Sequence, residues 1–256
     1  MIQQKEFPIL EFDDDPNPII DPFKLIKKQD VSEHCVLCFF GETLTAFLDE
    51  HGHATVSRFK AESHSFPIYE VDYKGRKVIL LQAYVGAPGA AAQIEELSAL
   101  GCRKFIACGG CGVLQKDIAV GNLIIPTSAV RDEGASYHYL PPSREVVGNP
   151  RAIQVIEETL REHKLPFIKG KTWTTDAFYR ETPAKVQLRK DEGCITVEME
   201  TATYMAVAQY RQVEFGQILY AGDSLAGEEW DNRDWMSRSD IRELLLRLSI
   251  EACLRL

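Results

Sequence analysis

The sequence lacks the features that attach a chain to nucleic acid or carry it into a membrane. Its 29 Lys and Arg residues are outnumbered by 38 Asp and Glu residues, and the formal net charge of −9 argues against a nucleic-acid-binding surface. Apolar runs such as CVLCFF at 35–40 are much shorter than the roughly 20 residues that span a bilayer. The first residues, MIQQKEFPILEF, do not join a basic start to an apolar stretch, so we expect no signal peptide.

The chain also lacks a cysteine pattern that predicts disulfides or a metal site. Seven cysteines, an odd number, favour a reducing compartment, and we expect a cytoplasmic protein. Cys35-x-x-Cys38 and Cys108-x-x-Cys111 could on paper supply four zinc ligands. The pairs are about 70 residues apart and the first lies in an apolar strand run, so buried thiols are the better interpretation. We expect no metal and no cofactor.

What the sequence does contain is an alternation of strand and helix patterns. Residues 1–30 are rich in Pro and Asp, and we expect an extended segment on the surface; residues 31–256 are predicted to form one α/β domain, its sheet covered on both faces. Strands are predicted at 34–41, 103–110, 121–130, 166–176, 194–200 and 215–224, with a hairpin at 66–86 around Lys74-Gly75. Helices are predicted at 42–52, 87–101, 149–164, 183–191, 201–211 and 240–256.

Chemically unusual residues follow four of these strands. Ligands of α/β sheets bind beyond the carboxyl ends of the strands, so these positions indicate a site. They are 41–43 (Gly-Glu-Thr), 108–112 (CGGCG), 198–200 (Glu-Met-Glu) and 222–224 (Gly-Asp-Ser).

Glu198, Met199 and Glu200 stand where a β-branched run gives way to an Ala-rich helical run. Glu200 could accept hydrogen bonds from both hydroxyls of a vicinal diol such as a ribose, while Met199 packs on the apolar face of the sugar. A carboxylate at a helix start is also favoured by the helix dipole. That alternative explains one glutamate but not the pair.

The glycines of CGGCG allow backbone N–H groups to approach an anion, although the loop is neither a Walker loop nor a dinucleotide fingerprint.

Asp223 could act as a general acid near the end of a central strand, or simply cap the following turn. Phe178 could stack on a planar base and Tyr179 could close the site, although a loop aromatic often only anchors its loop.

The chain resembles the nucleoside phosphorylase family, which includes uridine phosphorylases, hexameric purine nucleoside phosphorylases and related nucleosidases. The resemblance runs from about residue 35 to 250 and is carried by YVGAPGAAAQIEELSALG, VRDEGASYHY, TTDAFY and above all VEMETAT. It implies a three-layer α/β/α single domain with a central mixed sheet, and a homo-oligomer built from dimers with active sites at the dimer interfaces. By the same resemblance, Glu198, Met199 and Glu200 form the ribose grip and Phe178 stacks on the base.

The resemblance does not decide whether the base of the substrate is a purine or uracil. Asp223 matches the position of the acid that protonates the leaving base in purine-specific members. Uridine-specific members are more similar to this chain in the segments VRDEGASYHY and EMETAT, but they lack that acid. We favour a purine, because an acid near the leaving nitrogen is the sharper chemical feature.

The phosphate site departs from the family pattern. Thr45 and Ala107 stand where phosphorylases carry arginines, Gly110 stands where they carry a hydroxyl, and His64 falls where the neighbouring subunit lends a third arginine. Arg58 is near His64 in the sequence, but its spacing gives no particular reason to assign it to the phosphate site. We therefore expect phosphate to be a weakly held co-substrate, because charge-assisted bonds supply most of the affinity for a dianion.

We also expect Gly41, Gly109, Gly110 and Cys111, which follow two of the predicted strands, to bind the substrate. Two alternatives remain open. One is hydrolysis by water, as in the family's nucleosidases, although their glutamate is absent near Thr45 and only Glu42 lies close. The other is a nucleoside-binding protein that has lost turnover.

Overall fold

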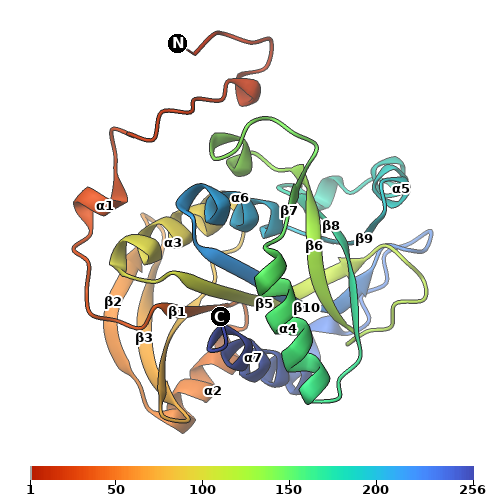
Figure 1. Cartoon of the computed structure of the whole chain (residues 1–256). Coiled ribbons are helices and arrows are strands. Elements are labelled where there is room, and N and C mark those ends of the chain that lie inside the picture. Colours follow the sequence, from red (N-terminus) through yellow and green to blue (C-terminus); the bar gives the residue numbers. More distant parts are fainter. Residues whose placement is uncertain (1) are drawn as a thin grey trace.

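The computed structural model describes residues 2–256 (Figure 1). The strands are β1 His34–Cys38, β2 Ala54–Lys60, β3 Ser65–Tyr73, β4 Arg76–Gln82, β5 Lys104–Val113, β6 Leu123–Asp132, β7 Glu145–Val147, β8 Phe167–Thr175, β9 Cys194–Glu198 and β10 Glu214–Ser224. The helices are α1 Pro22–Leu25, α2 Gly41–His51, α3 Ala87–Leu100, α4 Pro150–Glu162, α5 Pro183–Asp191, α6 Thr201–Arg211 and α7 Ser239–Cys253. Short 3₁₀ turns include Phe178–Arg180 and Trp235–Ser237.

The strands form a mixed sheet that closes on itself at one end. Strand β1 pairs in parallel with β4 and β5, while β2, β3 and β4 form an antiparallel meander. Strand β5 also pairs with β10 and β9, and β10, β6, β8 and β9 complete a ring of strands. The pairing of β1 with β5 ends at Cys38 and Cys108, although β5 continues to Val113. An opening beside Gly109 and Gly110 follows from this unequal length.

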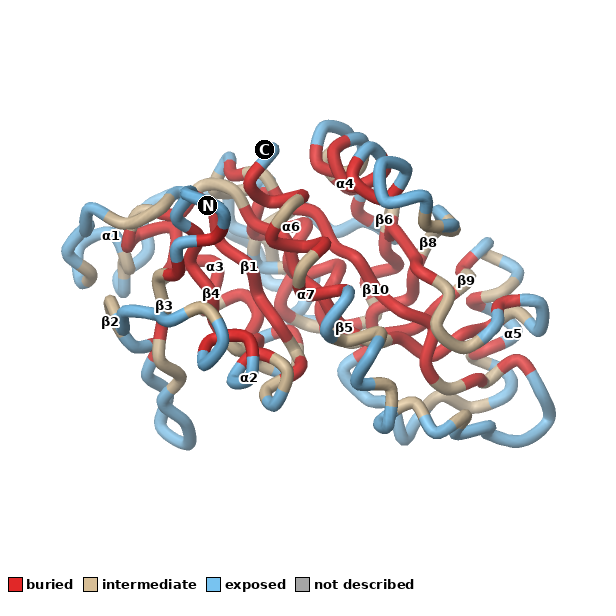
Figure 2. Tube along the Cα trace, turned by 90° about the horizontal axis from the view of Figure 1, so that it is seen from below, coloured by how far each residue is buried: buried red, intermediate tan, exposed pale blue. Residues whose placement is uncertain are grey.

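Helices cover both faces of the sheet, which confirms the three-layer α/β/α arrangement with a central mixed sheet. Val36 and Cys38 of β1 pack in one core with α2, α4 and α7. Cys35 and Leu37 alternate onto the other face and pack with α3 and α6, as the two-residue period of a strand requires. Figure 2 shows this buried centre along β1, β5 and β10.

Several local predictions are confirmed and others are wrong. The hairpin turns at Lys74 and Gly75, both with positive φ, and α5 has the predicted bounds. The sequence patterns missed the edge strand β2 and the short strand β7. The first 30 residues, expected to be extended throughout, contain the single-turn helix α1, which Asp21 caps by accepting a bond from the Phe23 N–H group. Figure 1 shows this segment running along the outside of the domain.

No helix among residues 2–256 is long and apolar enough to cross a bilayer.

Candidate active site

A pocket of about 370 Å³ lies in the opening beside the carboxyl end of β5. It contains five residues that the sequence predicted to contact a ligand: Gly109, Gly110, Glu198, Met199 and Glu200. The other lining residues come from β10, from the segments after β1 and β4, and from the segment before and within α7: Phe39, Phe40, Val85, Gln217, Leu219, Trp235, Met236 and Arg242. The prediction that a site forms at the strand ends is therefore consistent with the cavity that the fold produces.

Glu198 holds the junction between β9 and α6 in place. One carboxylate oxygen accepts hydrogen bonds from the hydroxyls of Thr174 at 2.6 Å and Thr172 at 3.4 Å. The other accepts from the N–H groups of Glu200 at 2.7 Å and Thr201 at 2.6 Å. Burial raises the pKa of Glu198 while these donors oppose the rise. Glu198 therefore caps the start of α6 with one oxygen and binds β8 with the other. Capping is the helix-start role that the sequence left as an alternative.

Glu200 differs from Glu198 in that its bonding capacity is largely unused. Its Oε1 accepts a hydrogen bond of 2.6 Å from the N–H group of Gly86, and no donor to Oε2 is found within residues 2–256. Gly86 has φ of +100°, a conformation that residues with a side chain rarely adopt. Burial raises the pKa of Glu200 to about 8, and the Glu198 carboxylate adds to the rise. Of the two carboxylates, Glu200 is the one free to bind polar hydrogens in the pocket.

The CGGCG segment was predicted to be a loop, which is wrong: residues 108–112 lie within strand β5, which pairs with β10. Its glycines are required by close packing on both sides. A Cβ on Gly109 would lie 3.0 Å from the Phe39 ring, and one on Gly110 would lie 3.2 Å from the Tyr220 ring. Cys111 lies behind the pocket wall, with its thiol 3.4 Å from the Tyr220 carbonyl. Burial raises the pKa of the Cys111 thiol, so this side chain is a neutral packing group. Its predicted contact with a ligand stays a prediction.

The positions matched to the family's phosphate ligands carry no charge. Gly41 begins α2, and a Cβ on it would lie 3.1 Å from the side-chain amide of Gln82. Thr45 donates its hydroxyl to the carbonyl of Gly41 at 3.0 Å, and Ala107 is fully buried in β5. The neighbouring Phe40, rather than Gly41, lines the pocket.

Asp223 lies near the end of β10 and accepts a 2.7 Å hydrogen bond from the indole N–H of Trp230. A Cβ on Gly112 would lie 3.4 Å from its Oδ1, so Asp223 is beside the carboxyl end of β5, but it does not line the pocket that contains Glu200. The turn after β10 is capped by Ser224, whose hydroxyl accepts from the N–H of Ala226 at 3.2 Å. Within the described chain, Asp223 makes no backbone cap of this kind.

Phe178 and Tyr179 lie on the short turn after β8, 50% and 88% exposed, with ring centroids 4.1 Å apart. Neither ring lines the pocket that contains Glu200. Glu181 follows on the same turn, and burial together with the Asp223 carboxylate raises its pKa to about 7. Glu181 was missed by the sequence reasoning, which assigned only aromatics to this loop.

His64 lies near the tip of the β2–β3 hairpin, exposed to solvent. Its ring stacks on Phe66 and meets Tyr84 edge-on, and its Nδ1 is 2.7 Å from the Ser63 hydroxyl. His64 does not line the pocket of its own chain. Its predicted donation to a neighbouring subunit stays a prediction.

Sequence patterns also missed three pocket residues: Gln217, Trp235 and Arg242. Gln217 is buried in β10 and accepts a 2.7 Å bond from the Thr201 hydroxyl. Trp235 comes from the segment after β10, for which the sequence made no prediction, and Arg242 comes from α7, which was predicted only as the closing helix. A helical wheel of α7 identifies its core face but not the pocket that Arg242 reaches.

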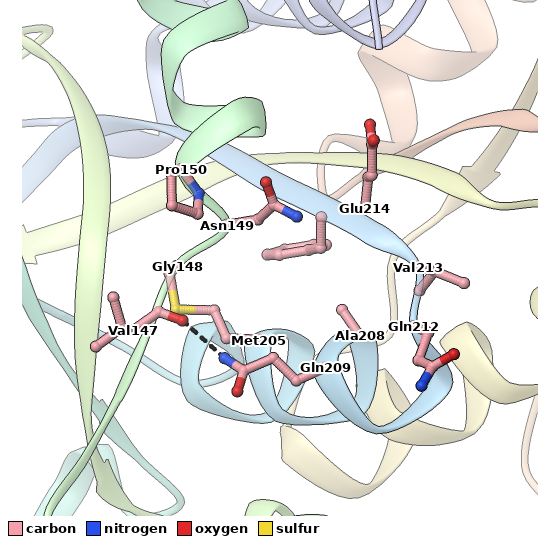
Figure 3. Close-up of a pocket in the computed structure, with 11 residues that line it drawn as sticks. Val147, Gly148, Asn149, Pro150, Met205, Ala208, Gln209, Gln212, Val213 and Glu214 are labelled. Atoms are coloured by element: carbon pink, nitrogen blue, oxygen red, sulfur yellow. Dashed lines mark hydrogen bonds between the residues drawn. The ribbon is translucent and has the colours of Figure 1, made fainter.

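A second cavity, of about 470 Å³, lies between the end of α6, the start of α4 and the start of β10 (Figure 3). Gln209 crosses it to donate a 2.8 Å hydrogen bond to the Val147 carbonyl. Its lining includes no cation, and Glu214 is its one titratable residue. It shares no residue with the strand-end pocket, and its chemistry offers no catalytic group.

All seven cysteines are free and buried. No cluster of three or more metal-ligating side chains occurs in the part of the chain that the structure describes.

The fold and the pocket together define an α/β protein with a strand-end site suited to a hydroxyl-bearing ligand. The chain belongs to the phosphorylase superfamily, whose family model matches residues 33–254. This finding confirms the resemblance to nucleoside phosphorylases that VEMETAT and the other motifs indicated.

Individual relatives act on different nucleosides. The chain is 28% identical over 202 residues to a guanosine phosphorylase of Halorubrum lacusprofundi, covering 77% of this chain and 83% of the relative. It is 24% identical over 212 residues to uridine phosphorylase of Escherichia coli, with the same coverages of 77% and 83%. A solved AMP nucleosidase from Bacteroides thetaiotaomicron has the same fold, with a TM-score of 0.70 and 24% identity over 88% of this chain and 89% of that one.

The hydrogen bonds of Glu198 predict a structural role that can be measured. Glu198→Gln keeps the shape but replaces one acceptor oxygen by an NH₂ group within a set of donors. We expect the free energy of unfolding to fall by about 1–3 kcal/mol, measured by urea denaturation. Glu228→Gln, at an exposed loop position, is the matched control. An unchanged urea midpoint for Glu198→Gln would contradict this role.

The raised pKa of Glu200 predicts how stability depends on pH. The folded protein retains a proton up to about pH 8, whereas an unfolded chain loses it near roughly 4.3. Stability therefore falls as pH rises through this interval, because the folded state binds more protons. Glu200→Gln is neutral throughout, so its urea midpoint should exceed that of the wild type increasingly between about pH 5 and 9. A midpoint difference that is constant with pH would refute the burial effect.

Proposed function

We propose that the protein cleaves the N-glycosidic bond of a nucleoside, with a purine preferred over uridine and phosphate as the acceptor. The observation that carries this proposal is the unequal bonding of the two pocket carboxylates. Glu198 has four protein donors, whereas Glu200 has one, from Gly86. Glu200 would accept the two hydroxyls of a ribose, with Met199 against the sugar.

The reaction requires the sugar carbon to become electron-poor while the base departs. An oxygen of phosphate forms a bond to C1′, the C1′–N bond breaks, and its electron pair goes to the base nitrogen. Asp223 supplies the proton that neutralises the departing base, and Trp230 orients the acid through its 2.7 Å hydrogen bond. The carboxylates of the pocket stabilise the positive charge that develops on the sugar.

Phe178 supports the base site only if its turn folds inward over the bound base, because its ring is half exposed. Asp223 favours a purine, since a purine base has a ring nitrogen that can accept a proton from an acid as the base leaves. The guanosine phosphorylase relative agrees with this preference, and the uridine phosphorylase relative does not. We also propose a homo-oligomer in which His64 completes the site of a neighbouring subunit.

Water is the alternative acceptor, favoured by the uncharged Thr45 and Ala107 and by the fold shared with an AMP nucleosidase. A panel of nucleosides assayed with and without phosphate distinguishes the possibilities. Phosphorolysis yields ribose 1-phosphate and hydrolysis yields ribose. A protein that binds a nucleoside but forms neither product would be a binding protein and would end the enzymatic proposal.

Glu200→Gln tests the sugar contact. We expect it to reduce kcat/KM for a ribonucleoside by a factor equivalent to about 2–4 kcal/mol, because the carboxyl oxygens that accept the two ribose hydroxyls are altered in a buried site. The loss should be smaller for the 2′-deoxynucleoside, which offers one hydroxyl fewer. Equal losses for both substrates, or none in a folded variant, would remove Glu200 from the sugar site.

Asp223→Asn tests the general acid. It should slow release of an ordinary purine by about 10²-fold or more. A nucleoside whose base leaves easily without protonation should be affected much less. Trp230→Phe keeps the Asp223 carboxyl group but removes its hydrogen-bond donor. Its rate of purine release is expected to lie between those of the wild type and Asp223→Asn. If Asp223→Asn slows both substrates equally, Asp223 has a structural role.

A further inference from the structure

Among residues 2–256, Arg242 of α7 is the only cationic side chain that lines the strand-end pocket. It lies about 130 residues after the CGGCG segment in the sequence, and the family resemblance gives it no role. The pocket otherwise carries the two carboxylates Glu198 and Glu200. An anion that enters it therefore needs a cation on the opposite wall.

The guanidinium of Arg242 is held in place without being neutralised. Its Nη2 and Nε lie 3.3 and 3.4 Å from the Tyr220 hydroxyl, and Nη2 lies 3.3 Å from the Trp235 carbonyl. The Phe40 and Trp235 rings flank it at 5.2 and 5.8 Å. No carboxylate of residues 2–256 forms an ion pair with it, whereas Arg247, further along α7, pairs with Glu50 at 2.6 Å.

Tyr220 connects this cation to the CGGCG segment. Its hydroxyl donates to the Trp235 carbonyl at 2.8 Å and is oriented to accept from Arg242. A Cβ on Gly110 would lie 3.5 Å from the same hydroxyl. Through Tyr220, Arg242 is thus close to the glycines of β5 that the sequence assigned to an anion, and Phe40 connects it to the start of α2 at Gly41.

The other cation near the family's phosphate positions is engaged elsewhere. Arg58 of β2 donates from Nε to the Ser65 hydroxyl at 2.8 Å and from Nη2 to the Ser65 carbonyl at 3.0 Å. Both bonds hold it along the β2–β3 hairpin, and it does not line the strand-end pocket.

We propose that Arg242 binds the phosphate co-substrate, and that it replaces the positive charge missing at Thr45 and Ala107. A guanidinium presents a planar fork that matches two phosphate oxygens, and the flanking rings limit the conformational freedom lost on binding. This inference rests on the proposed function, because it takes free inorganic phosphate as the ligand. The same chemistry could bind the 5′-phosphate of a nucleotide, which the test separates.

The first measurement is the dependence of rate on phosphate concentration. Arg242→Gln should raise the KM for phosphate at least about tenfold, with little change in the KM for the nucleoside. Arg242→Lys should recover part of this loss, since it keeps the charge without the fork. Arg247→Gln removes the same charge from the same helix outside the pocket and should behave as the wild type.

The second measurement needs no turnover. Inorganic phosphate should raise the Tm of the wild type and of Arg247→Gln, since a ligand that binds only the folded state stabilises it. It should raise the Tm of Arg242→Gln much less. Arg242→Lys should show an intermediate shift, which keeps the test informative if Arg242→Gln folds poorly.

The outcomes separate this inference from the proposed function. A phosphate-induced shift that depends on Arg242, without phosphorolysis, supports the inference and refutes phosphorolysis. Phosphorolysis with an unchanged phosphate KM in Arg242→Gln overturns the inference alone. An effect of Arg242→Gln that appears only with a nucleoside 5′-monophosphate, and not with the nucleoside, also overturns it and assigns the cation to the substrate's phosphate.

Discussion

The bonds of the buried Glu198 carboxylate are the interaction on which the site depends. They join β8, through Thr172 and Thr174, to the first N–H groups of α6. Those N–H groups have no partner within the helix, so the carboxylate satisfies donors that would otherwise be buried unpaired. Because the N–H group of Glu200 is one of them, the direction in which Glu200 leaves the chain is set by Glu198. Two adjacent acidic residues thus perform different tasks, one structural and one facing the pocket.

The pocket itself results from two strands of unequal length. Pairing between β1 and β5 stops at Cys38 and Cys108, and β5 continues as Gly109 and Gly110 between the Phe39 and Tyr220 rings. This packing excludes side chains at these two positions of β5, so neither position can offer a side-chain donor to an anion. Positive charge has to enter from another element, and α7 brings Arg242 there.

Local pattern and resemblance predicted most of the fold because its central elements follow the ordinary periods. β1 is apolar on both faces, and α4 begins with Asn149 as a cap and Pro150 in its first turn. β2 was missed because ATVSRFK, an edge strand, is mostly polar. The closure of the ring by β10, which pairs with both β5 and β6, depends on contacts between distant segments that no local pattern contains.

The site was predicted only in part for the same reason: local patterns do not contain contacts between distant segments. Met199, Glu200 and the CGGCG segment are contiguous motifs, and they were found. Gln217 and Arg242 are ordinary residues of a strand and a helix, and only tertiary packing brings them to the pocket. Glu198 was assigned to the ligand together with Glu200, because a sequence does not show which of two neighbouring carboxylates meets the helix start.

The proposed reaction needs negative charge near the sugar and positive charge near the phosphate, and the pocket places these charges on different elements. Carboxylates near the sugar favour a positively charged transition state, but they also repel a phosphate dianion that has lost its hydration. The conflict is eased when the cation is on a different wall from the carboxylates, since the phosphate then approaches the sugar carbon from the side of Arg242 and the CGGCG segment. Glu198 and Glu200 are on β9 and at the start of α6, whereas Arg242 is on α7, on the other face of the sheet from α6. This separation allows one small pocket to stabilise both signs of charge.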